Sequence, residues 1–146
     1  MTAGDIKGEE AVIDVLTAGA SVSAGDTVHL EADGKWDPVV AGDTGKFAVA
    51  IESASGDGET FRAVVWGRVE VTATAATIDA YGHVVAGDTG KIKAASNMAT
   101  LDAPAAYDEA DMQTELDKIL DPRLVVGTVT EAFASGGTGT LFVGLI

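Results

Sequence analysis

Alternating apolar and polar positions recur along the chain and predict short β-strands. Phe47, Val49 and Ile51 fall on one side of a period-2 pleat, and residues 69–72 alternate in the same way. Val, Thr, Phe and Trp fill these runs, and Gly-Asp, Asp-Gly and Gly-Gly pairs separate them. The pattern predicts an all-β fold, either a barrel or a sandwich, of about eight to ten short strands.

One segment has a helical period instead. Met112, Leu116 and Ile119 lie at i, i+4 and i+7, and acidic residues gather in the early part of the segment, where a helix dipole favours them. A proline stands near each end. We therefore expect one amphipathic helix, carried by an insertion at about residues 97–121.

An eight-residue sequence, Val-Val-Ala-Gly-Asp-Thr-Gly-Lys, occurs twice, at 39–46 and at 84–91. A shorter Ala-Gly-Asp-Thr copy stands at 24–27. A strand-like run follows each long copy. The repeat predicts that the fold is built from two related β units.

The two units divide a single β domain that spans residues 1–146. We expect an N-terminal arm and a first strand at 1–17, the first β unit at 18–72, and the second β unit at 73–146. The helical insertion falls within the second unit. The length and the 47% hydrophobic composition suit one folded domain with its own core.

Glycine and aspartate in the repeated copies are typical of turns. Glycine tolerates positive φ, and aspartate hydrogen-bonds to nearby backbone. A phosphate-binding loop needs a further glycine before Gly-Lys and a hydroxyl after it, and neither copy has them. We expect structural turns at Gly25, Asp26, Gly42, Asp43, Gly45, Gly87, Asp88 and Gly90.

Acidic residues outnumber basic ones, 23 to 9, for a formal net charge of -14. Contacts to a phosphate backbone need a basic face, so we expect no nucleic-acid partner. The acids are scattered and lysine is scarce, which favours adaptation to molar salt over an ordinary acidic domain. No stretch approaches the roughly 18 to 20 apolar residues that cross a bilayer, so we expect no membrane partner.

Residue types that carry catalysis or bind metals are scarce. Cysteine is absent. His29 and His83 lie in strand-like runs, and we expect both to face outward. Asp33, Asp37 and Asp43 lack the spacing of an EF-hand loop. We therefore expect no enzymatic activity, no cofactor and no metal site.

The two tryptophans and the N-terminal arm are the candidate contact residues. We expect Trp66 in the core. Trp36 follows an Asp-Gly pair, and we expect it to be exposed in a turn as a partner anchor. Met1, Thr2 and Ile6 of the arm are the other expected contacts, with a frayed terminus as the alternative.

The first unit resembles the small capsid decoration proteins of tailed viruses, also called cement or head-stabilising proteins. The resemblance rests on three runs: Ala24 to Lys35, Phe47 to Ala54 and Gly58 to Val69. They follow the family's order of a Gly-Asp-x-Val turn, a Gly-Lys turn, a strand, a Gly-Glu turn and a second strand. The second unit is similar more loosely, and the helical insertion and the acidity depart from the family's pattern.

The resemblance implies a non-enzymatic virion structural protein that binds the outside of the assembled capsid. Such a protein stabilises the shell by bridging major capsid protein subunits. The resemblance also implies a homotrimer, made in the host cytoplasm and carried on the outer surface of the virion. The acidity suggests a virus of a halophilic archaeon. The alternative is a carrier or adaptor β-barrel of the biotinyl or lipoyl type, presenting Lys46 or Lys91 at a hairpin tip.

Overall fold

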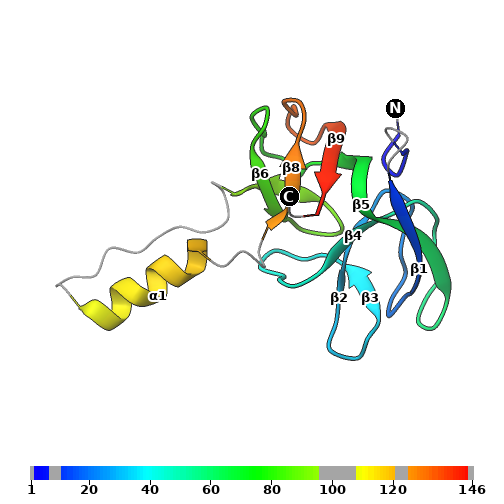
Figure 1. Cartoon of the computed structure of the whole chain (residues 1–146), viewed down its shortest axis with the longest axis horizontal. Helices are drawn as coiled ribbons and strands as arrows, with labels where there is room; N and C mark the ends of the chain where they lie inside the picture. The colour runs from blue at the N-terminus through cyan, green and yellow to red at the C-terminus, as the bar shows by residue number, and fades with distance from the viewer. Residues whose placement is uncertain (1, 7–10, 96–107, 121–124, 145–146) are drawn as a thin grey trace.

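The computed structural model describes residues 2–6, 11–95, 108–120 and 125–144. Within that part of the chain, nine strands form one antiparallel sheet that curls into a half-barrel, accompanied by one short helix (Figure 1). The prediction of an all-β fold is confirmed.

The strands are short, except for one. Those of the first half are β1 (Val12–Thr17), β2 (Thr27–Leu30), β3 (Trp36–Pro38), β4 (Phe47–Ala50) and β5 (Thr60–Thr72). Those of the second half are β6 (His83–Ala86), β7 (Ile92–Ala94), β8 (Val125–Val129) and β9 (Thr138–Val143). The order across the sheet is β3-β2-β4-β5-β9-β8-β6-β7, and β1 also pairs with β5.

The long strand β5 serves both halves of the sheet. Its first part pairs with β1 and β4, and its second part, from Gly67 onward, pairs with β9. Gly67 stands at this change of partner with a φ of 121°, a conformation that side chains disfavour. The run at residues 69–72, which was predicted as a strand, is therefore the end of one long continuous strand.

The two halves repeat one arrangement, which confirms the prediction of two related units. Going outward, the first unit runs β1, β5, β4, β2, β3, and the second runs β5, β9, β8, β6, β7. The strand at the far edge returns to the start of the unit through a parallel bridge in both cases. The bridge joins Ala18 to Trp36 in the first unit and Ala73 to Ile92 in the second.

The two identical octapeptides do not occupy equivalent places in these units. The copy at 39–46 follows β3 and leads into β4, whereas the copy at 84–91 forms most of β6 and the turn into β7. By position in the sheet, β6 matches β2 and β7 matches β3. The repeat correctly indicated a duplication, but its alignment of the units is wrong, because the same letters serve a loop in one unit and a hairpin in the other.

Two hydrophobic clusters form the core, and β4 separates them. Phe47 and Val49 pack in the larger cluster, which extends through the second unit, whereas Ala48 and Ala50 pack in the smaller cluster inside the first unit. Every residue of β4 is buried. A strand that is covered on both faces holds the two units together.

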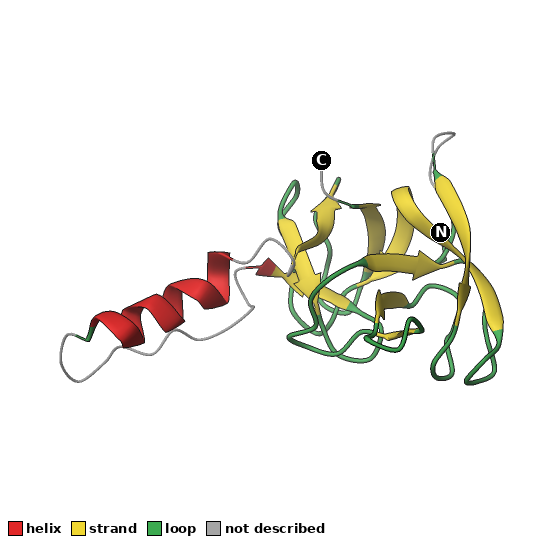
Figure 2. Cartoon of the chain, turned by 60° about the horizontal axis from the view of Figure 1, so that its bottom comes forward, coloured by secondary structure: helices red, strands yellow, loops and turns green. Residues whose placement is uncertain are grey.

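The predicted helix is present as α1 (Glu109–Leu120). It lies apart from the sheet in both views (Figures 1 and 2). Asp108 caps it, because its carboxylate accepts hydrogen bonds from the N–H groups of Ala110 and Asp111 at 2.9 and 3.2 Å. Met112 is 43% exposed, so sheet packing does not bury this residue. The rest of the predicted insertion, residues 97–107 and 121, lies outside the described residues.

Candidate functional site

Three turns in the first half of the chain share one conformation. In each, a glycine has a φ of 92°, 95° or 93°, and the following aspartate N–H donates to the carbonyl three residues earlier at 3.1, 3.0 or 3.2 Å. The aspartate carboxylate in turn accepts a hydrogen bond from the N–H of the residue three positions earlier, at 2.9, 2.9 or 2.7 Å. The turns are Thr2–Asp5, Ser23–Asp26 and Val40–Asp43.

The sequence reasoning singled out the second and third of these turns and missed the first. Its signal was present, because Ala-Gly-Asp stands at 3–5 as it does at 24–26 and 41–43. The sequence reasoning assigned this segment to an N-terminal arm, with partner contact or a frayed terminus as its two alternatives.

The first two turns pack directly against each other. Gly25 donates its N–H to the carbonyl of Ala50 at 2.7 Å. A Cβ added at Gly25 would lie 2.5 Å from the Cβ of Ala3. Only glycine therefore fits at this contact.

The second octapeptide reaches the same place from the other unit. Thr27 N–H donates to Gly90 C=O at 2.7 Å, and Gly90 N–H donates to Val39 C=O at 2.9 Å. Ala41 N–H donates to a carboxylate oxygen of Asp88 at 3.4 Å. We call this meeting of residues 2–5, 23–27, 39–43 and 88–91 the turn junction.

The turn junction contains a partly buried acid. Asp26 lies so close to Gly90 that a Cβ on that glycine would be 2.7 Å from the Asp26 carboxyl carbon. Burial raises the pKa of Asp26, and the hydrogen bond from Ser23 N–H opposes this rise. The hydrogen bonds of the turn junction thus stabilise the arrangement of the two units. The burial of the ionised Asp26 carboxylate opposes this stabilisation.

His29 does not face outward as predicted; it is buried, with 7% exposed. Its Nε2 lies 2.8 Å from a Glu31 carboxylate oxygen and 3.1 Å from one of Asp43. The alternation failed here because the turn that carries Asp43 folds over β2. His83, in contrast, is exposed, and its Nδ1 lies 3.2 Å from the Thr128 hydroxyl.

Trp36 is not in an exposed turn, which corrects the sequence prediction. The turn lies earlier: Gly34 has a φ of 82°, and Lys35 N–H donates to the Asp33 carboxylate at 3.0 Å. The chain then resumes as β3 at Trp36, whose partly buried side chain packs against the smaller cluster. Trp36 therefore supports the core of the first unit.

Trp66 was predicted in the core and is 40% exposed instead. It precedes Gly67, where β5 changes partners, so neither unit covers it fully. Its ring meets Phe142 edge-on, with centroids 4.8 Å apart and an interplanar angle of 87°. This edge-to-face contact holds the ring against β9.

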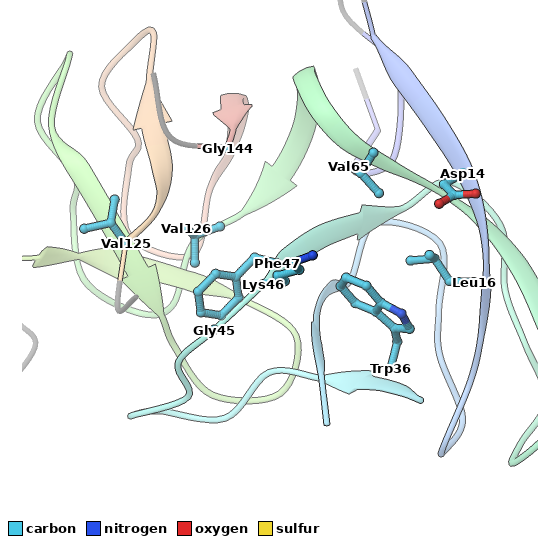
Figure 3. A pocket seen from close by; sticks show the side chains of 10 residues that line it. All are labelled: Asp14, Leu16, Trp36, Gly45, Lys46, Phe47, Val65, Val125, Val126 and Gly144. Carbon is cyan, nitrogen blue, oxygen red and sulfur yellow. The ribbon is translucent and has the colours of Figure 1, made fainter. Parts of the chain in front are cut away.

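A groove of about 450 Å³ lies beside Trp36, where β1 and β3 diverge (Figure 3). Its walls come from both units. They are formed by Asp14, Leu16, Trp36, Gly45, Lys46, Phe47, Val65, Val125, Val126 and Gly144.

Large apolar side chains are exposed on β1 and on the strand that it pairs with. Val12 is 53% exposed, Ile13 41% and Val15 62%. Trp66, which is the partner of Val12 across the β1–β5 pair, extends this region. We call these four residues the β1 surface. Clustered apolar exposure of this kind marks interaction sites.

The described part of the N-terminal arm is bound to the protein's own sheet. Gly4 N–H donates to Glu70 C=O at 2.7 Å, and Glu70 N–H donates to Asp5 C=O at 2.8 Å. Thr2 and Ile6 remain exposed on this bound segment. Met1 lies outside the described residues.

The described residues include no group of three or more His, Asp or Glu side chains placed to hold a metal ion. None of the helices in the described part is long and apolar enough to cross a membrane. No protein-family model matches the chain, and a search of curated proteins finds no match to it.

Proposed function

We propose that this protein is a non-enzymatic structural protein that binds the outside of an assembled virus capsid and bridges major capsid protein subunits. The β1 surface is the observation that carries the proposal. Four large apolar side chains, each 40% to 62% exposed, lie on two paired strands. Burying them against another protein removes apolar area from water, which stabilises the complex.

The nature of the partner rests on the resemblance of the first unit to capsid decoration proteins. A homotrimer on the virion surface would apply several copies of one modest contact together, which raises avidity without new chemistry. The net charge of -14 suits a particle that encounters molar salt.

Trp66 replaces Trp36 as the proposed anchor. An exposed aromatic ring that is already held by Phe142 loses little conformational freedom on binding. Trp36 is committed to the protein's own core.

Sedimentation of purified virus particles with added protein at molar salt tests the proposal. The wild type should pellet with the particles, and Trp66→Ala should pellet less. Tyr81→Ala removes another exposed aromatic, 79% exposed and in the other unit, and should pellet as the wild type does. Wild-type protein that stays in the supernatant would overturn the proposal.

The carrier alternative requires a lysine that protrudes at a hairpin tip. Lys91 closes the β6–β7 turn, but the adjacent Gly90 is hydrogen-bonded into the turn junction. Lys46 lines the groove. An intact mass that includes a biotinyl or lipoyl group would favour the carrier over the capsid protein.

A further inference from the structure

We propose that the open edge of β1 accepts an extended, basic segment of another protein as an added strand, with an apolar side chain in the groove beside Trp36. This inference rests on the proposed function only for the source of that segment, the capsid. The strand position itself follows from the hydrogen bonds of the sheet.

The open edge of β1 is defined by the directions of backbone groups. Arg62 lies opposite Val15, and its N–H donates to the Glu52 carboxylate at 3.1 Å while its C=O accepts from Ile51 N–H at 3.0 Å. Both bonds point to the side of β5 away from β1. In an antiparallel pair of this kind, the partner's N–H and C=O also point outward. Those of Val15 therefore point to the open edge.

The second unit contains the same arrangement. Thr140 N–H donates to the Glu131 carboxylate at 3.0 Å, and Thr140 C=O accepts from Thr130 N–H at 3.1 Å. Thr140 lies opposite Glu70 in β5. Glu70 therefore occupies the place in the second unit that Val15 occupies in the first.

At Glu70 this outer edge is filled. Gly4 and Asp5 bond to its C=O and N–H at 2.7 and 2.8 Å, within a short segment antiparallel to β5. At Val15, no backbone partner is found on that side in the described part of the chain. The fold thus shows, in one unit, the kind of segment that the equivalent edge of the other unit can take.

Asp14 covers the open edge with its own side chain. Its carboxylate accepts a hydrogen bond from Val15 N–H at 2.8 Å. A charged side chain on an edge strand protects it from indiscriminate pairing. When a carbonyl of an incoming strand takes over the Val15 N–H, the released Asp14 carboxylate favours a Lys or Arg on that strand.

The groove lies along the same edge. Leu16, Trp36, Phe47 and Val65 provide apolar walls (Figure 3). A volume of about 450 Å³ holds an aliphatic or aromatic side chain with room for the backbone beside it. Residues two apart on a strand share a face, so an apolar residue in the groove leaves the residue two positions along the strand free to meet Asp14, which lines the same groove.

Charge decides between a second copy of this chain and a basic partner. Each copy carries a net charge of -14, so a second copy brings few basic side chains to the Asp14 carboxylate. A basic segment supplies the cation that this carboxylate favours. The occupant is therefore an extended segment in which an apolar residue and a Lys or Arg stand two positions apart.

The test uses a capped peptide, Thr-Val-Thr-Lys-Thr-Val-Thr, a counterpart with Glu in place of Lys, and the full-length protein at about 0.1 M salt. Amide NMR should show the basic peptide shifting the signals of Val15 and the Trp36 indole, and the acidic peptide leaving them unchanged. Val15→Pro removes an N–H that points outward to the Asp14 carboxylate and not to β5, so the β1–β5 pairing is retained. It should weaken basic-peptide binding about tenfold, whereas Val15→Thr keeps it.

A basic peptide N-methylated at every residue keeps the test decisive if Val15→Pro fails to fold, because it should not bind the wild type. Equal binding of both charged peptides, or tight binding to Val15→Pro, overturns the inference. The inference is also overturned if the wild type self-associates and Val15→Pro abolishes this self-association, because a second copy of the chain is then the occupant of the edge. Particle sedimentation separates the two proposals. A Val15→Pro variant that still pellets with the particles would contradict only this inference. Wild-type protein that binds the peptide but not the particles would contradict only the proposed function.

Discussion

At the scale of single residues, glycine and aspartate at the turn junction account for much of how the two units meet. Gly25 combines a φ of 95° with a contact to Ala3 that leaves no room for a Cβ. Gly34 has a similar φ of 82°, but no atom lies within 4 Å of its added Cβ. A comparison of these two glycines therefore separates the cost of a side chain at positive φ from the cost of a steric clash.

Gly25→Ala should destabilise the protein more than Gly34→Ala. Both substitutions place a side chain at positive φ, at a cost of roughly 1 to 2 kcal/mol. Gly25→Ala also displaces the N-terminal turn. Urea unfolding measures the difference, which should disappear when residues 1–6 are deleted from both variants. Equal losses in the full-length protein would contradict the packing of the two turns.

Asp26→Asn should stabilise the protein at neutral pH. Burial raises the pKa of Asp26 above its ordinary value of 3.8, so the folded state binds this proton more tightly than the unfolded chain does. The free energy of unfolding therefore falls as pH rises from the ordinary pKa through the raised one, and the loss persists above it. Asparagine carries no charge and can still accept from Ser23 N–H. The gain seen in urea unfolding at pH 7 should vanish at a pH below the ordinary pKa of aspartate.

Glu52→Gln provides the control of opposite sign. Hydrogen bonds from Arg62 lower the pKa of Glu52, so the ionised form stabilises the folded state above its ordinary pKa and this contribution is lost in acid. The substitution should destabilise at pH 7 and have little effect in acid. The same pH dependence in both variants would show that a global charge effect dominates.

At the scale of elements, the identical octapeptides show where sequence reasoning reaches its limit. In the first copy, Gly42 supplies the positive φ and Asp43 closes the turn. In the second, Thr89 and Gly90 have φ of 54° and 73°, as in a type I′ hairpin turn, and Asp88 bonds across to the other copy. The local sequence signals predicted strands, turns and a duplication. Which residue of each copy forms the turn depends on the neighbouring strands, and the local sequence does not show these.

The tryptophans show the same limit for the candidate site. Sequence placed Trp36 outside and Trp66 inside, and the structure reverses both. Local pattern does not reveal that Gly34 completes its turn before Trp36, or that β5 changes partners after Trp66. Exposure at these residues depends on pairing between distant strands.

Replacing residues 97–121 with a short Gly-Ser linker should leave the β fold intact. The described helical side chains from Glu109 to Thr114 are exposed, and α1 lies apart from the sheet (Figure 2). Little apolar area is therefore lost with this part of the helix. The thermal midpoint should change by only a few degrees, roughly the effect of 1 kcal/mol or less. A large drop would show that the insertion supports β7 or β8.

At the scale of the whole molecule, the excess of acids opposes the compact state. A net charge of -14 on 146 residues produces repulsion that folding increases, because it brings carboxylates closer together. Only a few are paired among the described residues, as Lys35 with Asp57 and Arg62 with Glu52. Exposed pairs of this kind contribute little each, so screening by salt is the larger effect.

The thermal midpoint should therefore rise between about 0.1 M and 2 M sodium chloride, as the Debye length falls from roughly 10 Å to below 3 Å. Salt also strengthens apolar burial, so the rise alone does not isolate charge. Glu59→Lys combined with Asp79→Lys lowers the net negative charge at two exposed positions. This variant should be more stable than the wild type at low salt and gain less from added chloride. Calorimetry of both proteins across the salt series measures the two slopes, and parallel slopes would assign the salt effect to apolar burial and not to carboxylate repulsion.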